Sequence, residues 1–141
     1  MQLNPNSTAP DRVQAFVDTF KRAAEDASDE CYGLPVKLIL AMGGRVRLGN
    51  WTTQRDNQNW SNMKYVSSTN PPGNLGKGKN GWAVFCGRTS HAKSFANFFI
   101  KNARYSGLID YLQFTNSPSP TKCLRFIADA GYGGADALLL R

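Results

Sequence analysis

The sequence has few of the residues on which acid–base and metal sites depend. It contains one histidine, His91, and two glutamates, Glu25 and Glu30, in 141 residues. His91 lies among polar residues in the first turn of an expected helix, which indicates the surface and argues against histidine catalysis. Both glutamates lie on the first expected helix and are interpreted as solvated. We therefore expect no metal site and no cofactor.

Cysteine is also scarce. Cys31, Cys86 and Cys123 are too far apart for a zinc site. We interpret them as buried thiols. One disulfide with a thiol left over is the alternative, and it would need an oxidising compartment.

No apolar run is long enough to span a bilayer, and residues 1–10 lack the apolar core of a secretory signal. We expect this N-terminal stretch to be flexible and the chain to be made in the cytoplasm. Action in the periplasm or cell wall would then require a specialised export route, such as those that deliver antibacterial effectors or phage enzymes.

The charge is strongly one-sided, with 17 Lys and Arg against 10 Asp and Glu. A formal charge of +7 favours a polyanionic partner: nucleic acid, an anionic membrane or the bacterial cell wall. The basic residues are scattered along the chain instead of gathered on one helix, which argues against nucleic acid.

The patterning predicts a single domain over 1–141 that is mainly helical. A first helix spans 11–32 and stops at Gly33. A second begins at Pro35 and is apolar nearly all round, so it should be central and buried. Further helices are expected over 89–102, capped by Thr89 or Ser90, and over 104–114 and 119–131.

Residues 47–88 differ, being rich in Asn, Gly, Ser and Thr. We expect an inserted lobe there, with strands at 63–68 and 81–86 joined by a flexible basic loop over 70–81. An insertion of this size on a helical scaffold usually serves function, and a cleft would form beside it.

Three segments resemble one family when taken in order, and the third, the C-terminal half, contains two matching stretches. They are "YGLPVKLILA" (32–41), "NWSNMK" (59–64), "SHAKSFANFFIKNARYSGLI" (90–109) and "LRFIADAGYG" (124–133). Together they resemble the peptidoglycan β-N-acetylglucosaminidases of the flagellar and autolysin type. The resemblance implies a lysozyme-like fold of the mainly α (α+β) class, with a small loop and hairpin lobe bounding a substrate groove.

In that family the buried helix ends in Ala-Leu-Glu-Ser-Gly-Trp-Gly, and the Glu is the catalytic acid. Alignment on "LILA" places Val46 at the Glu and Arg47 at the Ser. Valine cannot transfer a proton, and loss of a general acid costs on the order of 10²–10⁴ in rate. Activity would then need another carboxylate in the groove.

Asp56 is the candidate replacement, because it lies in the insertion among loop- and sugar-type residues. Its alternative is a turn residue that bonds to the nearby backbone. Tyr132 matches the tyrosine that, in the resembled family, lines the groove and assists catalysis. Its alternative is a tyrosine packed at a helix end.

Five further residues are candidates for binding sugar, since aromatic rings stack on pyranose faces and Asn59 matches a family position. They are Trp51, Asn59, Trp60, Tyr65 and Trp82. The alternative for the aromatic members is packing in the core of a small lobe.

The resemblance implies a glycoside hydrolase that cleaves the GlcNAc–MurNAc backbone of peptidoglycan. We expect a monomer, and the small size, the positive charge and the absent signal favour a toxic antibacterial effector. Either another acid serves, or the Val46 form is disarmed. The alternatives are an inactive peptidoglycan-binding or assembly module and an interaction protein. A toxic effector would need a cognate immunity protein in the groove around Val46 and Asp56.

Overall fold

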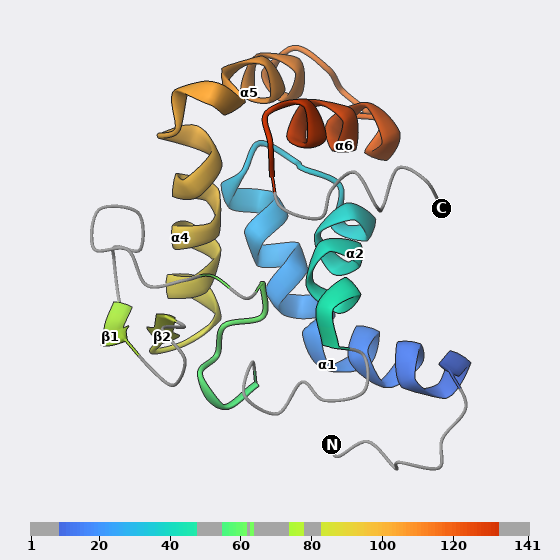
Figure 1. Ribbon diagram of the computed structural model, residues 1–141, viewed down its shortest axis with the longest axis vertical. Helices are drawn as coiled ribbons and strands as arrows, with labels where there is room; N and C mark the ends of the chain where they lie inside the picture. Colours follow the sequence, from blue (N-terminus) through green and yellow to red (C-terminus); the bar gives the residue numbers. More distant parts are fainter. Residues whose placement is uncertain (1–8, 48–54, 62, 64–73, 78–82, 133–141) are drawn as a thin grey trace.

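The computed structural model describes residues 9–47, 55–61, 63, 74–77 and 83–132, and the protein is mainly helical, as predicted (Figure 1). The helices are α1 (Ala9–Glu30), α2 (Val36–Arg47), α4 (Arg88–Ile100), α5 (Ser106–Gln113) and α6 (Pro120–Asp129). A short 3-10 turn, η2 (Ala103–Tyr105), precedes α5. Two strands, β1 (Asn74–Lys77) and β2 (Ala83–Phe85), form a small antiparallel sheet.

Helix α1 follows from its apolar spacing, which puts one buried stripe on a single face. The stripe consists of Phe16, Phe20, Ala23, Ala24 and Ala27. The helix ends where predicted, because Tyr32 and Gly33 adopt left-handed φ angles of 54° and 80°. The Gly33 N–H donates to the Ser28 carbonyl at 2.9 Å, which closes the helix with a Schellman-type bond.

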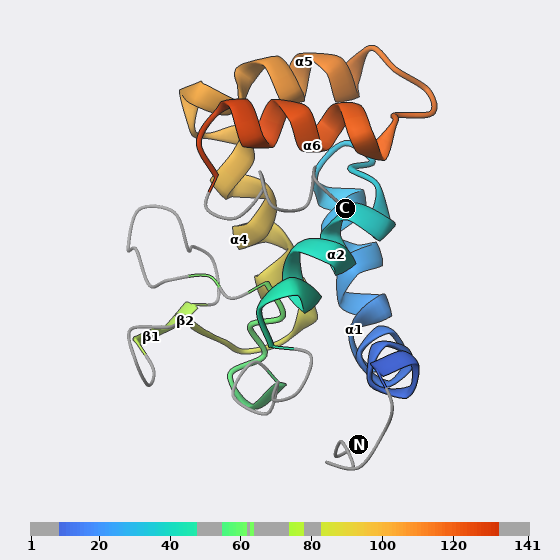
Figure 2. The same cartoon turned by 45° about the vertical axis from the view of Figure 1, so that its right-hand side comes forward.

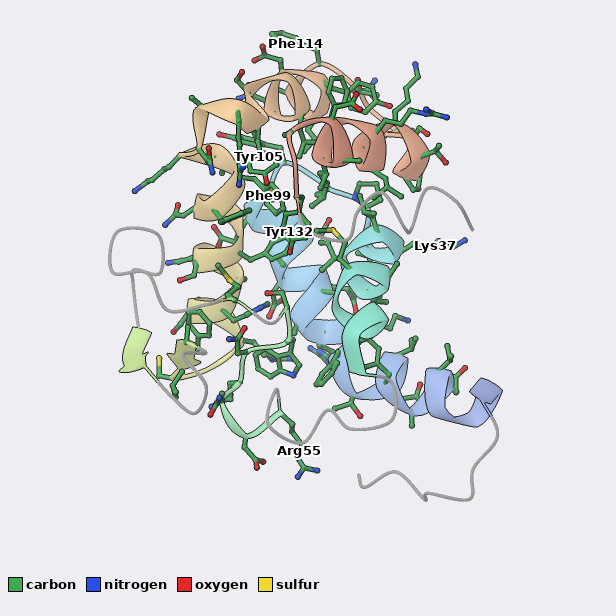
Figure 3. All side chains as sticks on the ribbon, viewed as in Figure 1. Lys37, Arg55, Phe99, Tyr105, Phe114 and Tyr132 are labelled. Carbon is green, nitrogen blue, oxygen red and sulfur yellow. The ribbon has the colours of Figure 1, made fainter. Side chains whose placement is uncertain are left out.

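The prediction that the second helix is the central one is wrong. Helix α1 lies between α2 and α4 and packs on both (Figure 1). Helix α2 buries Leu38, Ile39 and Met42, whereas Lys37 and Ala41 are exposed and Lys37 points outward (Figure 3). Apolar residues such as alanine and leucine occur on half-exposed helices as well as on buried ones. The composition of α2 therefore could not show whether this helix is central.

Helix α4 buries Phe95 and Phe99 as its spacing predicts. Its predicted cap is wrong: Gly87 is the N-cap and makes no side-chain bond, while Ser90 lies inside the helix. Helix α6 begins and ends as predicted, with Pro120 in its first turn and Gly131 at φ 88° beyond its end.

Helices α5 and α6 lie side by side across the end of the molecule away from the sheet (Figures 1 and 2). Strand β2 forms where a strand was expected. Its partner, however, is β1, with Lys77 opposite Ala83, and β1 falls within the stretch assigned to a loop. Residues 64–68 of the expected strand lie outside the described residues.

Two of the three cysteines fit the interpretation as buried thiols. Cys31 and Cys123 are fully buried, and burial raises the pKa of the Cys31 thiol to about 12. Cys86 is exposed, so the interpretation is wrong for this residue. All three are free thiols.

Candidate functional site

The last turn of α2 is the place where the resemblance expects a catalytic carboxylate, and a loop crosses it. A Cβ added to Gly43 would lie 2.8 Å from the backbone oxygen of Trp60. The segment made of residues 55–61 and 63 (the crossing segment) therefore touches α2 at Gly43 through the backbone of Trp60. Val46 follows three residues later, about 4.5 Å further along the helix axis.

Asp56 lies on the crossing segment and faces solvent. Its side chain is 63% exposed and pairs with the neighbouring Arg55, with a distance of 3.4 Å between Nε and Oδ1. Figure 3 shows Arg55 at the lower edge of the molecule, pointing away from the helices. A carboxyl that acts as a general acid normally lies in an apolar pocket, and 63% exposure does not fit that setting.

The other described carboxylates are also at the surface. Glu25 and Glu30 are exposed, as expected from the sequence, and Asp110 and Asp129 are exposed too. Asp26 is partly exposed and pairs with Arg88 at 3.7 Å. No Asp or Glu whose side chain is described is buried, and these residues form no cluster of three or more metal-ligand side chains.

Asn59 is buried, and its amide ties three backbone groups together. Its Nδ2 donates to the carbonyls of Met63 at 2.8 Å and Ala83 at 3.0 Å. Its Oδ1 accepts from the Met63 N–H at 2.9 Å. Asn59 therefore joins the crossing segment to strand β2, and its expected contact with sugar stays a prediction.

Trp60 is partly buried between two helices. Its ring makes edge-on contacts with Phe20 of α1, at 6.2 Å between centroids, and with His91 of α4, at 5.3 Å. These contacts fix the indole against the helical core. Packing thus accounts for part of the Trp60 surface, and the residue stays partly exposed.

His91 is not a surface residue, so that prediction is wrong: it is 1% exposed. Its Nε2 lies 2.6 Å from the Ser61 hydroxyl, and its Nδ1 has no hydrogen-bond partner in the described part of the chain. Burial lowers the pKa of His91 to about 3. So weak a base cannot readily take the proton of a serine nucleophile, so Ser61 and His91 form a structural pair and not a catalytic one.

A signal for the burial of His91 was present in the sequence. His91, Phe95 and Phe99 recur at intervals of four residues on α4. That spacing continues the buried stripe back to His91. The polar neighbours of the histidine hid this periodicity.

Tyr132 is placed by the end of α6. Its N–H donates to the Ile127 carbonyl at 3.2 Å, beside the left-handed Gly131. The ring stacks on Phe99, with centroids 6.1 Å apart and planes at 21°. Burial raises the pKa of Tyr132, and the nearby Tyr105 phenol adds to the rise.

Tyr132 and Phe99 lie between α4 and the end of α6, in the upper half of the view in Figure 3, whereas Arg55 lies at its lower edge. The structure thus brings Asn59 and Trp60 to the end of α2 that holds Val46. Tyr132 lies further off, at the far end of a row of ring contacts that runs from Trp60 through His91, Phe95 and Phe99. Trp51, Tyr65 and Trp82 lie outside the described residues.

Comparison with protein-family models, with curated proteins and with solved structures finds no match to this chain. The resemblance to the glucosaminidases therefore stays a prediction from the sequence motifs. In the part of the chain that the structure describes, no helix has the length and hydropathy needed to cross a membrane.

Proposed function

We propose that the protein is directed at the glycan strands of peptidoglycan and binds them at the end of α2. The observation that supports this is the contact between Gly43 and the Trp60 backbone. It joins the helix of the first family-like motif to the segment of the second. The positive charge of the chain suits a wall polymer rich in carboxylates.

The available chemistry favours binding over cleavage. Hydrolysis of a glycosidic bond needs one group to protonate the leaving oxygen and a second to assist attack. Val46 provides neither, and none of the carboxylates whose side chains are described is buried. The protein is accordingly proposed as a glucosaminidase-type fold that holds glycan and cleaves it slowly or not at all.

The hydrolase remains the second candidate because of Asp56. This carboxylate lies on the crossing segment, four residues before Trp60. A glycan bound at the end of α2 would lie near that segment, so Asp56 is the described acid best placed to assist cleavage. On either candidate the substrate is outside the cytoplasm, and a cognate inhibitor would cover Val46 and Asp56.

The test combines binding and product analysis on purified, insoluble peptidoglycan. Sedimentation measures binding, and mass spectrometry of soluble muropeptides with new reducing ends measures cleavage. The variants are Val46→Glu and Asp56→Asn, with Asp110→Asn as the matched control because Asp110 is an exposed carboxylate on α5.

We expect the unaltered chain to sediment with peptidoglycan without releasing muropeptides, and Val46→Glu to release them. Release by the unaltered chain that is lost in Asp56→Asn but kept in Asp110→Asn would establish the hydrolase instead. Absence of both binding and products from every version would refute the proposed substrate.

A further inference from the structure

His91 contacts three separate parts of the chain. Trp60 and Ser61 come from the crossing segment, Phe85 comes from β2, and Phe95 belongs to α4 itself. The ring centroids lie 5.3 Å from Trp60, 5.6 Å from Phe85 and 6.1 Å from Phe95. These four neighbours form what we call the His91 cage.

The cage suits a neutral imidazole and opposes a charged one. Three of its four members present aromatic rings, and Ser61 bonds to only one ring nitrogen. A neutral ring leaves Nδ1 without a partner, whereas protonation would bury a positive charge and leave an N–H donor unsatisfied as well. Both effects make the charged form costly in an apolar site.

Charged groups around the cage do not offset this cost. Arg55 and Asp56 pair with each other near the surface, as do Arg88 and Asp26, and Lys93 is exposed. The other charged side chains described on α1 are exposed, and strand β2 has no charged residue. Burial is the cause of the low pKa of His91.

The crossing segment and the sheet are held by a few identifiable contacts. Apart from the cage, these include the Asn59 bonds, the Phe85 N–H to the Asn57 carbonyl at 2.9 Å, and the Gly43 contact. The Trp60 ring also packs on Phe20 of α1, and Met63 packs against the large apolar cluster. The large apolar cluster, by contrast, spans α1, α2, α4, α5 and α6. The His91 cage is therefore one of the attachments of this small unit to the helical core, and it is where both the crossing segment and β2 meet α4.

We propose that His91 is a positioning residue whose neutral imidazole locks the crossing segment and β2 onto α4, so that acid releases this unit, and opens the hydrogen bonds within it, before the helical core unfolds. The proposal is independent of the proposed function, because it concerns the opening of the chain and not an action on glycan. It assigns His91 a role that depends on its protonation as well as on its shape.

Two measurements on the full chain test this. The first is an NMR titration of the imidazole, which needs no assignment because the chain has one histidine. The second is amide hydrogen exchange at pH 7 and pH 5, corrected for intrinsic rates. The reporters are the amides of Met63 and Phe85, compared with amides of α1 between 20 and 27.

For an ordinary histidine pKa of 6.5 in the open state and about 3 in the closed state, the opening equilibrium should rise about 25-fold between pH 7 and pH 5. We expect that loss of protection at Met63 and Phe85 but not in α1. In His91→Phe, whose ring fills the cage without titrating, protection should not change with pH.

Three results would overturn the proposal. One is an imidazole that titrates near 6.5 in the folded protein, a test that needs no variant. The second is parallel loss of protection in α1, which would mean global unfolding. The third is an unchanged pH response in His91→Phe, because a purely space-filling role would leave the pH profile to other groups.

Discussion

Replacing Gly43 with alanine tests whether the crossing segment packs on α2 as described. In an exposed helix this change stabilises by about 1 kcal/mol, because alanine has the higher helix propensity. Here the new methyl group would meet the Trp60 backbone oxygen at 2.8 Å and the Phe16 ring at 3.5 Å. A backbone oxygen cannot rotate away as a side chain can.

Overpacking of this kind costs about 1–3 kcal/mol. After the gain in propensity, we expect Gly43→Ala to lower the free energy of unfolding by up to about 2 kcal/mol. Urea denaturation followed by circular dichroism measures the change as a lower midpoint at an unchanged slope. The variant should also bind peptidoglycan less tightly if Trp60 contributes to that surface.

Gly107→Ala is the matched control on α5. Its new methyl group would meet only the Phe126 side chain, at 3.3 Å, and Phe126 is 38% exposed and free to shift. We therefore expect Gly107→Ala to be neutral or to stabilise by up to about 1 kcal/mol. If Gly43→Ala proved as stable as Gly107→Ala, the close approach of Trp60 to α2 would be refuted.

Three further results are expected. At pH 8 the folded protein should react with a thiol reagent only at the exposed Cys86. The buried thiols of Cys31 and Cys123 should react only after denaturation, and rapid reaction of more than one thiol would contradict their burial. Gly131→Ala should lower the free energy of unfolding by about 1 kcal/mol, because alanine is strained at the Gly131 φ angle of 88°. An unchanged urea midpoint would count against this left-handed conformation. The folded-state pKa of His91 is below its ordinary value, so its contribution to stability is complete above about pH 6.5 and is lost as the pH falls toward 3. The free energy of unfolding should therefore fall by about 2 kcal/mol between pH 7 and pH 5. The reference is His91→Phe, which has no titrating group at position 91.

Local periodicity was enough to predict most of the helices. The spacing of Phe16, Phe20 and Ala24 fixes α1, and Pro120 and Gly131 bracket α6. Each of these signals lies within one element, where residues three or four apart share a face. The same local reasoning could not show that α1, and not α2, is the central helix, since that depends on which elements meet.

The candidate site was less predictable because its contacts link distant parts of the chain. Gly43 meets the backbone of Trp60, Asn59 bonds to Ala83, and Ser61 bonds to His91. Polar side chains such as asparagine and serine give no sequence signal that separates a ligand-binding group from one that ties two segments together. The partner of β2 was missed for a related reason, because glycine and asparagine in β1 favoured a loop.

The contacts that hold the candidate site do not depend on a carboxylate. Asn59, Trp60, Ser61 and His91 attach the crossing segment through amide, aromatic and hydroxyl groups. A valine at position 46, where the resemblance expects an acid, is therefore compatible with these attachments. The attachments of the crossing segment and the residue at position 46 can thus be tested independently by Val46→Glu. If that one change gives muropeptide release, the crossing segment presents glycan to the end of α2.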